Sequence, residues 1–533
     1  MHRRVLGAQT PSDRLLENSS GSITNIAETS NTAACESKTG SFNISMKEAE
    51  ELLSLFKLRR MYFPFVEVPN IASAASMASS RPFLLLAILT VCLVRKPFLQ
   101  KRVDERFRRV LSERIVFHGE KSLDYVQGIL IYIAWCPLHL RPLNNQISQF
   151  LQMLSTMISD LKLSQNVDDE ASRNACLGTH NLCSLLSVSL GRRGDDPAYS
   201  YLKAALDANK TSGQPYDNRL RYSRLQVFFE ETYRCQVNRG SDGCPIKTQQ
   251  IVQETMESLR LDLQIFERMQ GCDNVPLHLS AMSLKVNIAF MPFKVLDTKP
   301  GYKGHPKSSL VPPGQESYLL EHAYSCLTEI RVFFEYFLSI PADQYIHFSI
   351  REWCELVLTI SSASHICFLS FSSMSPEWND FRTKARSSVL IYVESLSHRM
   401  WTLSVSKPGD PPDKYFMFKS VLDIVLSTYA STTTPPPSQP SVTGETSSVT
   451  QSDPQEVAPP ATTSSRCPMM NGSIRDSDFW QAMEQSDILY LESLGIGTNG
   501  QYAFASGAVG TDNLFDDAGD WPSIFSEWVN VSN

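Results

Sequence analysis

Residues 81–91 of the chain read RPFLLLAILTV, and three segments with helical spacing follow before residue 163. Apolar residues recur in them at steps of three and four: Val103, Phe107, Val110, Leu111 and Ile115; then Leu123, Val126, Ile129, Leu130 and Ile133; then Ile147, Phe150, Leu151, Leu154 and Ile158. This spacing places the apolar side chains on one face of an α-helix. Because only short connections separate these faces, they must bury one another, and we predict a core of packed helices.

The same periodicity extends the predicted core in both directions. A short amphipathic helix is expected at 47–58, and the prolines within residues 61–69 predict an extended segment after it. Further helices are predicted at 168–190, 219–233, 251–266, 277–293, 315–338, 348–370, 378–403 and 413–429. Since no run alternates as a strand does, the predicted fold class is all-α, with one large multi-helix body over residues 46–430.

Composition separates this body from its flanks. Residues 1–45 are rich in Ser, Thr, Asn and Gly, and residues 431–470 are mostly Ser, Thr and Pro, so we predict a disordered N-terminal segment and a disordered linker. Residues 471–533 form an acidic, aromatic tail. From 431 onward thirteen acidic residues face two arginines, so this part carries −11 and the rest +4 of the net charge of −7. Such asymmetry is typical of an interaction tail.

Several classes of protein are excluded by simple counts. The N-terminus lacks the apolar region of a secretory signal, and the longest apolar run, Phe83 to Val94, is twelve residues, too short to span a bilayer. Twelve cysteines in 533 residues are too few for a disulfide scaffold. We therefore expect a soluble, intracellular protein without membrane contact.

Motifs for catalysis or metal binding are weak. Gly495 to Gly500 matches G-x-G-x-x-G but lies in the polar tail, where a loop is expected. The pairs Cys176/Cys183 and Cys235/Cys244 lack zinc-ligand spacing and are predicted to be free thiols, with the first pair on an apolar helix. His347 and His365 are predicted to be ordinary core or surface residues. Nucleophile-elbow, P-loop and kinase signatures are absent from the sequence, so we expect neither an enzyme nor a cofactor.

One stretch of the body is strongly basic. Between Arg95 and Arg114, eight Lys and Arg residues stand against Asp104, Glu105 and Glu113. The pattern favours the solvated face of an amphipathic helix, while phosphate binding is the alternative interpretation. In the second case the chain alone is expected to bind DNA weakly, without sequence preference and with steep salt dependence.

The acidic tail combines charge with large aromatics. Trp521, Ile524, Phe525 and Trp528 recur at i, i+3, i+4 and i+7, the spacing of a helix that binds in a partner's groove. Together with Phe479, Trp480 and Phe515 they are the predicted partner-binding residues of an activation region. The alternative is that the tail is simply a disordered, soluble terminus.

Several short motifs occur along the body in a fixed order. They are residues 63–66 (FPFV), 81–88 (RPFLLLAI), 119–124 (GEKSLD), 127–128 (QG), 132–135 (YIAW), 158–161 (ISDL), 177–178 (LG), 182–184 (LCS), 218–219 (NR) and 225–226 (LQ). In this order and spacing they resemble the regulatory region of fungal binuclear zinc-cluster transcription factors. The resemblance covers roughly residues 46–430 and is strongest before residue 235.

This resemblance implies an all-α regulatory body and a nuclear activator, often of a gene cluster for secondary metabolism. It also implies partners: the transcription machinery or a coactivator for the tail, and another copy or a different protein for the body. The family's DNA-binding part holds two zinc ions with six cysteines, yet only Cys35 lies in the first 91 residues. We therefore expect DNA contact to be indirect or to require an upstream domain. A helical scaffold that binds a partner without activating is the alternative function.

Overall fold

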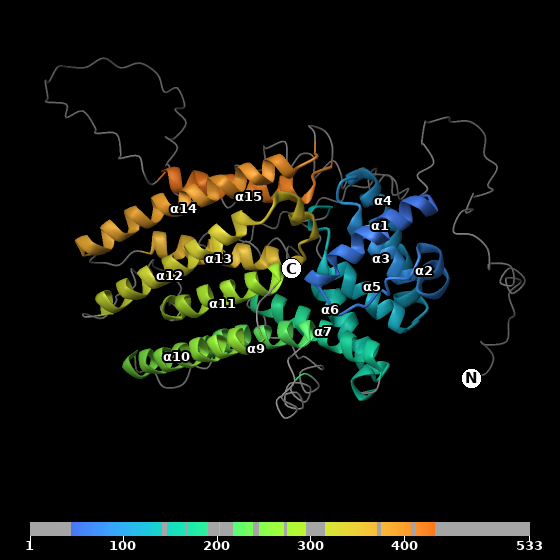
Figure 1. Ribbon diagram of the computed structural model, residues 1–533, viewed down its shortest axis with the longest axis horizontal. Coiled ribbons are helices and arrows are strands. Elements are labelled where there is room, and N and C mark those ends of the chain that lie inside the picture. The colour runs from blue at the N-terminus through green and yellow to red at the C-terminus, as the bar shows by residue number, and fades with distance from the viewer. Residues whose placement is uncertain are drawn as a thin grey trace, which may run out of the picture.

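The computed structural model describes residues 44–140, 146–166, 169–189, 202, 217–237, 245–270, 274–294, 315–369, 375–406 and 411–431. All regular elements within these ranges are helices, so the predicted all-α class is confirmed (Figure 1). The α-helices are α1 (Met46–Arg59), α2 (Ala74–Ser80), α3 (Pro82–Cys92), α4 (Pro97–Val110), α5 (Leu123–Ala134), α6 (Ile147–Asp160), α7 (Glu170–Ser189), α9 (Asn218–Val237), α10 (Pro245–Gln270), α11 (Val275–Lys294), α12 (Gln315–Ser339), α13 (Ile350–Phe368), α14 (Pro376–Leu403) and α15 (Lys414–Ser431). The shorter elements are η1 (Arg60–Tyr62), η3 (Leu138–Leu140), η4 (Leu163–Gln165) and η6 (Ala342–His347), which are 3₁₀ turns, and η2 (Leu111–Phe117), which is a π-helix.

Most predicted helices appear with similar ends, and the differences have physical causes. α10 begins at Pro245 rather than at 251, with proline in the first helical position, where its missing N–H does no harm. The prediction of an extended segment over 61–69 is wrong in its first half. There the chain passes through η1 and a turn, because Phe63 and Phe65 are both buried with their ring centroids 5.0 Å apart. α2 has no counterpart among the predicted helices.

The N-terminus of α3 shows how the opening motif folds. Pro82 occupies the first turn, and the next two backbone N–H groups point at a carboxylate from the start of α5. Asp124 accepts hydrogen bonds from the backbone nitrogens of Phe83 at 3.0 Å and Leu84 at 2.9 Å. These N–H groups have no partner inside their own helix, so the carboxylate satisfies them. Its negative charge also interacts favourably with the positive end of the helix dipole. A distant residue thereby caps α3.

Two glycines allow helices to approach closely. A Cβ atom on Gly128 of α5 would lie 2.4 Å from the ring of Phe83 in α3. A Cβ atom on Gly178 of α7 would lie 2.7 Å from the Cβ atom of Phe65. Both distances are shorter than atomic contact permits, so only glycine fits without a shift of the neighbour. In both cases, two sequence motifs that lie far apart along the chain contact each other in the core.

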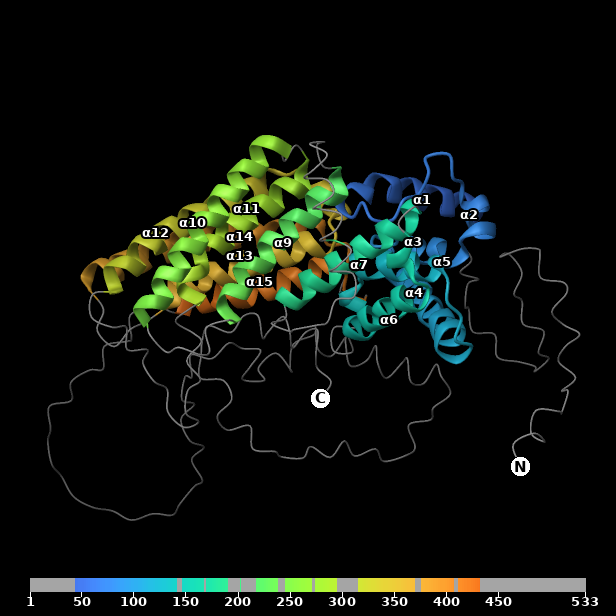
Figure 2. The same ribbon diagram turned by 90° about the horizontal axis from the view of Figure 1, so that it is seen from below.

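The helices form two halves that share one hydrophobic core. Helices α1 to α7 make the N-terminal half, in which α3 packs on α5, α1 and α4. Helices α9 to α15 make a bundle of longer helices in which α11 contacts α9, α10, α12 and α13. Figures 1 and 2 show the first half at one end of an elongated molecule and the ends of α12 and α14 at the other. Within the described ranges, no helix has both the length and the apolarity that a membrane span requires.

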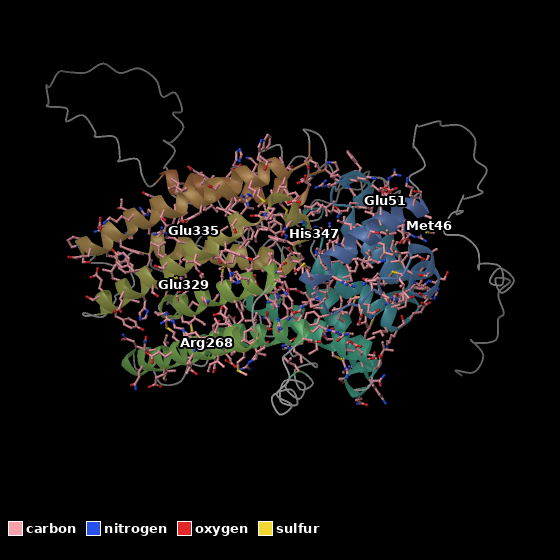
Figure 3. All side chains as sticks on the ribbon, in the orientation of Figure 1. Met46, Glu51, Arg268, Glu329, Glu335 and His347 are labelled. Carbon is pink, nitrogen blue, oxygen red and sulfur yellow. The ribbon has the colours of Figure 1, made fainter. Side chains whose placement is uncertain are left out.

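Aromatic side chains fill the junction between the halves. The indole Nε1 of Trp135, at the end of α5, donates a hydrogen bond of 3.0 Å to the carbonyl oxygen of His347. The Trp135 ring also makes edge contacts with Phe56 and Phe63, at centroid distances of 5.7 and 6.2 Å. Tyr62 packs against the His347 ring from the N-terminal side. Figure 3 labels His347 where the two halves meet. The halves are therefore packed against each other rather than tethered.

Candidate functional site

The first two turns of α13 carry three charged residues into the protein interior. Ser349 caps this helix, and its backbone nitrogen and hydroxyl each donate to Glu352 Oε2 at 2.7 Å. The Ser349 side chain in turn accepts from the backbone nitrogen of Glu352, and this reciprocal capping box fixes the Glu352 carboxylate against the helix end. Arg351, Glu352 and Glu355 are all buried. We call these three residues, with the partners described next, the polar junction.

Three other helices supply partners for the polar junction. Asn181 of α7 accepts a hydrogen bond from Arg351, and the hydroxyl of Ser280 in α11 donates to Glu355 at 2.6 Å. Arg351 and Glu355 form an ion pair of 3.7 Å, and the guanidinium lies over the ring of Tyr222 in α9 at 5.7 Å. A buried charge is tolerated only when it is paired and hydrogen-bonded. These contacts therefore tie α7, α9, α11 and α13 together.

Burial changes the acidity of this group. It raises the pKa of the Glu352 and Glu355 carboxyls above the usual range, and the charge of Arg351 opposes the increase only in part. The charge of Glu352 raises the pKa of Glu355 further. Glu352 Oε1 and Glu355 Oε2 each expose less than 1 Å² and have no hydrogen-bond partner. Burial therefore favours the protonated form of both carboxyls, and these two oxygens are shielded from solvent.

A second group of basic side chains, Arg59, Lys414 and His347, lies close together at the junction between the halves. Arg59 of α1 is fully buried and donates to the carbonyl oxygen of Val91 at 2.8 Å. Burial lowers the pKa of the Lys414 amine well below its usual value, and the neighbouring Arg59 lowers it further. For His347, burial is also the first cause of a pKa of about 4, followed by Arg59 and Lys414. This histidine is therefore neutral at physiological pH.

Cofactor and thiol chemistry find little support in the described ranges. These ranges contain no group of three or more His, Cys, Asp or Glu side chains placed to hold a metal ion. The thiols of Cys176 and Cys183 are free of disulfides as predicted, the first buried and the second half-buried. Burial raises the pKa of the Cys136 and Cys367 thiols to about 12, and thiols of such high pKa are poor nucleophiles.

A groove of about 600 Å³ runs along the outer side of α12 and α14. Its lining residues come from the end of α12, the start of η6 and the second half of α14: Leu338, Ala342, Glu394, Ser395, His398, Arg399 and Thr402. Arg399 is held in place because its guanidinium donates to the carbonyl oxygen of Ile340 at 2.9 Å. The lining carries charge of both signs, from Glu394 and Arg399.

The basic stretch predicted from the sequence lies on α4 and η2. Arg102, Arg106 and Arg109 are exposed, as expected of a solvated helical face. Arg108 differs, because it turns inward and donates to Asp104 at 3.1 Å and to the Tyr132 hydroxyl at 2.8 Å. The Tyr132 hydroxyl in turn donates to Asp104 at 2.6 Å. One of the eight basic residues is therefore part of the buried core.

The predicted partner-binding residues fall outside the described ranges. They are Phe479, Trp480, Phe515, Trp521, Ile524, Phe525 and Trp528. The glycines of residues 495–500 and Cys244 lie outside as well, whereas Cys235 lies in α9. His347 and His365 are core residues, since His347 is half-buried against Tyr62 and His365 packs edge-on against Phe290 at 5.2 Å.

The polar junction was not predicted from the sequence. A local signal existed in the capping-box spacing of Ser349 and Glu352, with a serine three residues before a glutamate. The spacing predicts a helix start, and says nothing of burial. The partners Asn181, Tyr222 and Ser280 come from three distant helices, so the cluster is a product of tertiary packing.

Comparisons with known proteins point in one direction. The chain is 24% identical over 355 residues to transcription factor himD of Aspergillus japonicus, a match that covers 62% of this chain and 57% of that protein. It is 23% identical over 419 residues to transcription factor opdL of Penicillium oxalicum strain 114-2, with 70% of each protein covered. The chain thus matches little more than half the length of the first relative. No protein-family model matches the chain, and no solved structure matches it.

Proposed function

We propose that the protein is a regulator of transcription. The observation that carries this proposal is the similarity to two fungal proteins named as transcription factors, along 62% and 70% of the chain. The described helices support it indirectly, because buried carboxylates without solvent access and thiols of raised pKa suit a binding body better than a catalyst. Nuclear localisation is part of the proposal, as is control of a fungal gene cluster for secondary metabolism.

The finer part of the proposal assigns activation to the tail. Acidic residues keep the large aromatics of residues 471–533 in water, ready for the groove of a coactivator or of the transcription machinery. The stretch from Asp520 to Trp528 is too short to hold a helix alone in water. On a partner it orders by burying Trp521, Ile524, Phe525 and Trp528 together, each aromatic contributing about 1.5 kcal/mol or more. The acidic residues mainly speed the encounter.

A reporter assay tests the activation role. Residues 470–533 are fused to an unrelated DNA-binding domain, and reporter output is measured for the native sequence and for two variants. Replacing Trp521, Phe525 and Trp528 by alanine is expected to abolish output, since at least about 4 kcal/mol of contact energy is lost. The matched variant Asp516→Asn with Asp517→Asn keeps the aromatics and is expected only to reduce output.

The alternative function predicts a different result. If the native fusion is inert, or if the triple alanine variant keeps full output, the tail does not activate. A helical scaffold that recruits a partner through the body then becomes the better hypothesis. The groove along α12 and α14 is the first surface to mutate in that case.

A further inference from the structure

The exposed side of α4 and η2 has a definite pattern of charge. Arg102, Arg106 and Arg109 follow one another at steps of four and three, so their side chains share one face of the helix. All three are exposed. Arg106 and Arg109 have no carboxylate partner among the described residues, whereas Arg114 is paired with Glu120 at 3.0 Å. No described carboxylate therefore neutralises the positive charge of Arg106 and Arg109.

Exposed apolar residues lie at both ends of the same stretch. Phe98, in the first turn of α4, is 55% exposed, while Val116 and Phe117 of η2 are 67% and 81% exposed. From Phe98 to Val116 the helical rise amounts to roughly 25 Å. Large exposed apolar side chains that flank a charged patch mark an interaction surface. We call the residues Phe98, Arg102, Arg106, Arg109, Val116 and Phe117 the α4 face.

The pattern favours an acidic, aromatic peptide over nucleic acid. Phosphates satisfy arginines, but a phosphate backbone gives exposed phenylalanines nothing to pack against. A peptide with carboxylates between two apolar groups would instead match the α4 face along its length.

We propose that the tail of the same chain, residues 514–528, docks on the α4 face. Its sequence has the complementary order: Leu514 and Phe515, then Asp516, Asp517 and Asp520, then the aromatic stretch from Trp521 to Trp528. The carboxylates face the arginines, and the two apolar groups cover Phe98 and the η2 residues. Ten residues span about 15 Å as a helix and about 33 Å when extended, so a partly extended segment matches the length of the face.

The connection between the two sites is long enough. The last described helix ends at Ser431, and roughly 80 residues separate it from the docking segment, giving a typical reach of about 50 Å for a flexible chain. Tethering also gives the segment a high effective concentration at the α4 face, so weak contacts suffice. The docking itself does not depend on the proposed function. Its consequence does: a docked tail cannot place the same aromatics in the groove of a coactivator.

Site-specific cross-linking in the full-length chain tests the docking directly. A photoreactive benzoylphenylalanine replaces Phe117, and the same group replaces Ile391 of α14, which is 62% exposed, as the control position. After irradiation, mass spectrometry of the monomeric product is expected to join residue 117 to a peptide from 510–533. The control position is expected to give at least about fivefold less of this product.

Charge variants show whether the arginines hold the tail. Arg106→Glu with Arg109→Glu is expected to lower the tail cross-link about fivefold or more, because two attractions become repulsions. Lys162→Glu with Arg268→Glu changes the net charge equally, at exposed positions after α6 and on α10, and is expected to keep the cross-link. Figure 3 labels Arg268 on α10. High salt is expected to weaken the product in the native chain, since exposed pairs are screened.

Three results would overturn the proposal: no tail peptide at residue 117, equal yields at both positions, or cross-links found only in covalent dimers. A fourth is that Arg106→Glu with Arg109→Glu abolishes binding to duplex DNA while the tail cross-link is unchanged, which would assign the arginines to nucleic acid. These outcomes are independent of the reporter assay. An inert tail fusion with a strong cross-link at residue 117 would refute the activation role and leave the docking intact.

Discussion

Gly128 lies in the middle of α5, where alanine would normally stabilise a helix by up to about 1 kcal/mol. Here a Cβ atom would stand 2.4 Å from the ring of Phe83, and 3.3 Å from the carbonyl oxygen of that residue. The cost of this clash outweighs the gain in helix propensity. Gly128→Ala is therefore expected to lower the free energy of unfolding by about 1–3 kcal/mol. Chemical denaturation of the purified chain, followed by circular dichroism, measures the change.

A second substitution separates the clash from a general effect on the helix. Phe83→Leu makes room for the new methyl group, at the cost of the stacked contact between Phe83 and Phe107 at 4.8 Å. The double variant is expected to be more stable than the sum of the two single changes predicts, because the residues are in contact. If the effects of the two substitutions simply add, the contact between α5 and Phe83 is not the cause of the destabilisation by Gly128→Ala.

The buried carboxyl of Glu355 is expected to make the stability of the protein depend on pH. Burial raises its pKa, and that of Glu352, above the value of about 4.3 in an unfolded chain. Between the unfolded and the folded pKa the native protein binds more protons, so the free energy of unfolding falls as pH rises through this window. Glu355→Gln removes one of the titrating groups and is expected to flatten the decline between pH 5 and pH 8.

Urea denaturation at several pH values measures this slope. Each group contributes at most about 1.4 kcal/mol per pH unit, so the difference between the native chain and the variant is well above the error of such measurements. Glu377→Gln makes the same chemical change at an exposed position of α14 and is expected to keep the native slope. A native chain whose stability rises over the same range would contradict the proposed protonation of the polar junction.

At the scale of single elements, α3 depends on a residue that is not its own. Asp124 of α5 accepts two backbone hydrogen bonds at the N-terminus of α3, and hydrogen bonds to a charged group contribute about 1.5–3 kcal/mol. Asp124→Ala is therefore expected to lower the free energy of unfolding by about 2–4 kcal/mol. Asp124→Asn keeps one acceptor oxygen and is expected to cost less, in the same denaturation experiment.

The cap also explains why α3 and α5 are expected to weaken together. Asp124 lies in the first turn of its own helix, so its loss removes a negative charge that favours that N-terminus as well. Hydrogen exchange in the Asp124→Ala variant should show faster exchange at both helix starts, while α14 remains protected. Fast exchange spread evenly over all helices would instead indicate a global loss of stability.

Across the whole molecule, the apolar periodicity predicts where the helices lie along the sequence, but it does not predict which residues of different helices contact each other. Steps of three and four located α5, α12 and α14 closely, because each has a continuous apolar face. α2 was missed because its sequence, AASMASS, has only one large apolar residue. The polar junction was missed because its parts lie far apart along the chain, and burial of charge has no sequence period. Nothing in the described ranges tests the residues predicted in the tail.

The last prediction concerns the junction between the halves. Trp135 is 8% exposed, bonds the carbonyl oxygen of His347 and contacts Phe56 and Phe63, so it connects α5 with both sides of the junction. We expect the native body to unfold in one transition, because the core is continuous. Trp135→Ala is expected to cost about 3–5 kcal/mol and to separate the unfolding of the halves. Scanning calorimetry would then show two transitions, or a van't Hoff enthalpy below the calorimetric one.

A buried aromatic far from the junction provides the control. Phe334 of α12 is fully buried and stacks on Tyr392 of α14 at 5.4 Å, within the C-terminal half. Phe334→Ala removes a comparable amount of apolar contact, so it is expected to lower the melting temperature while the single transition remains. If Phe334→Ala split the unfolding transition as readily as Trp135→Ala, the contacts of Trp135 would not be what couples the unfolding of the two halves. Two transitions in the native chain would mean that the junction does not couple the halves, because each half would then melt on its own.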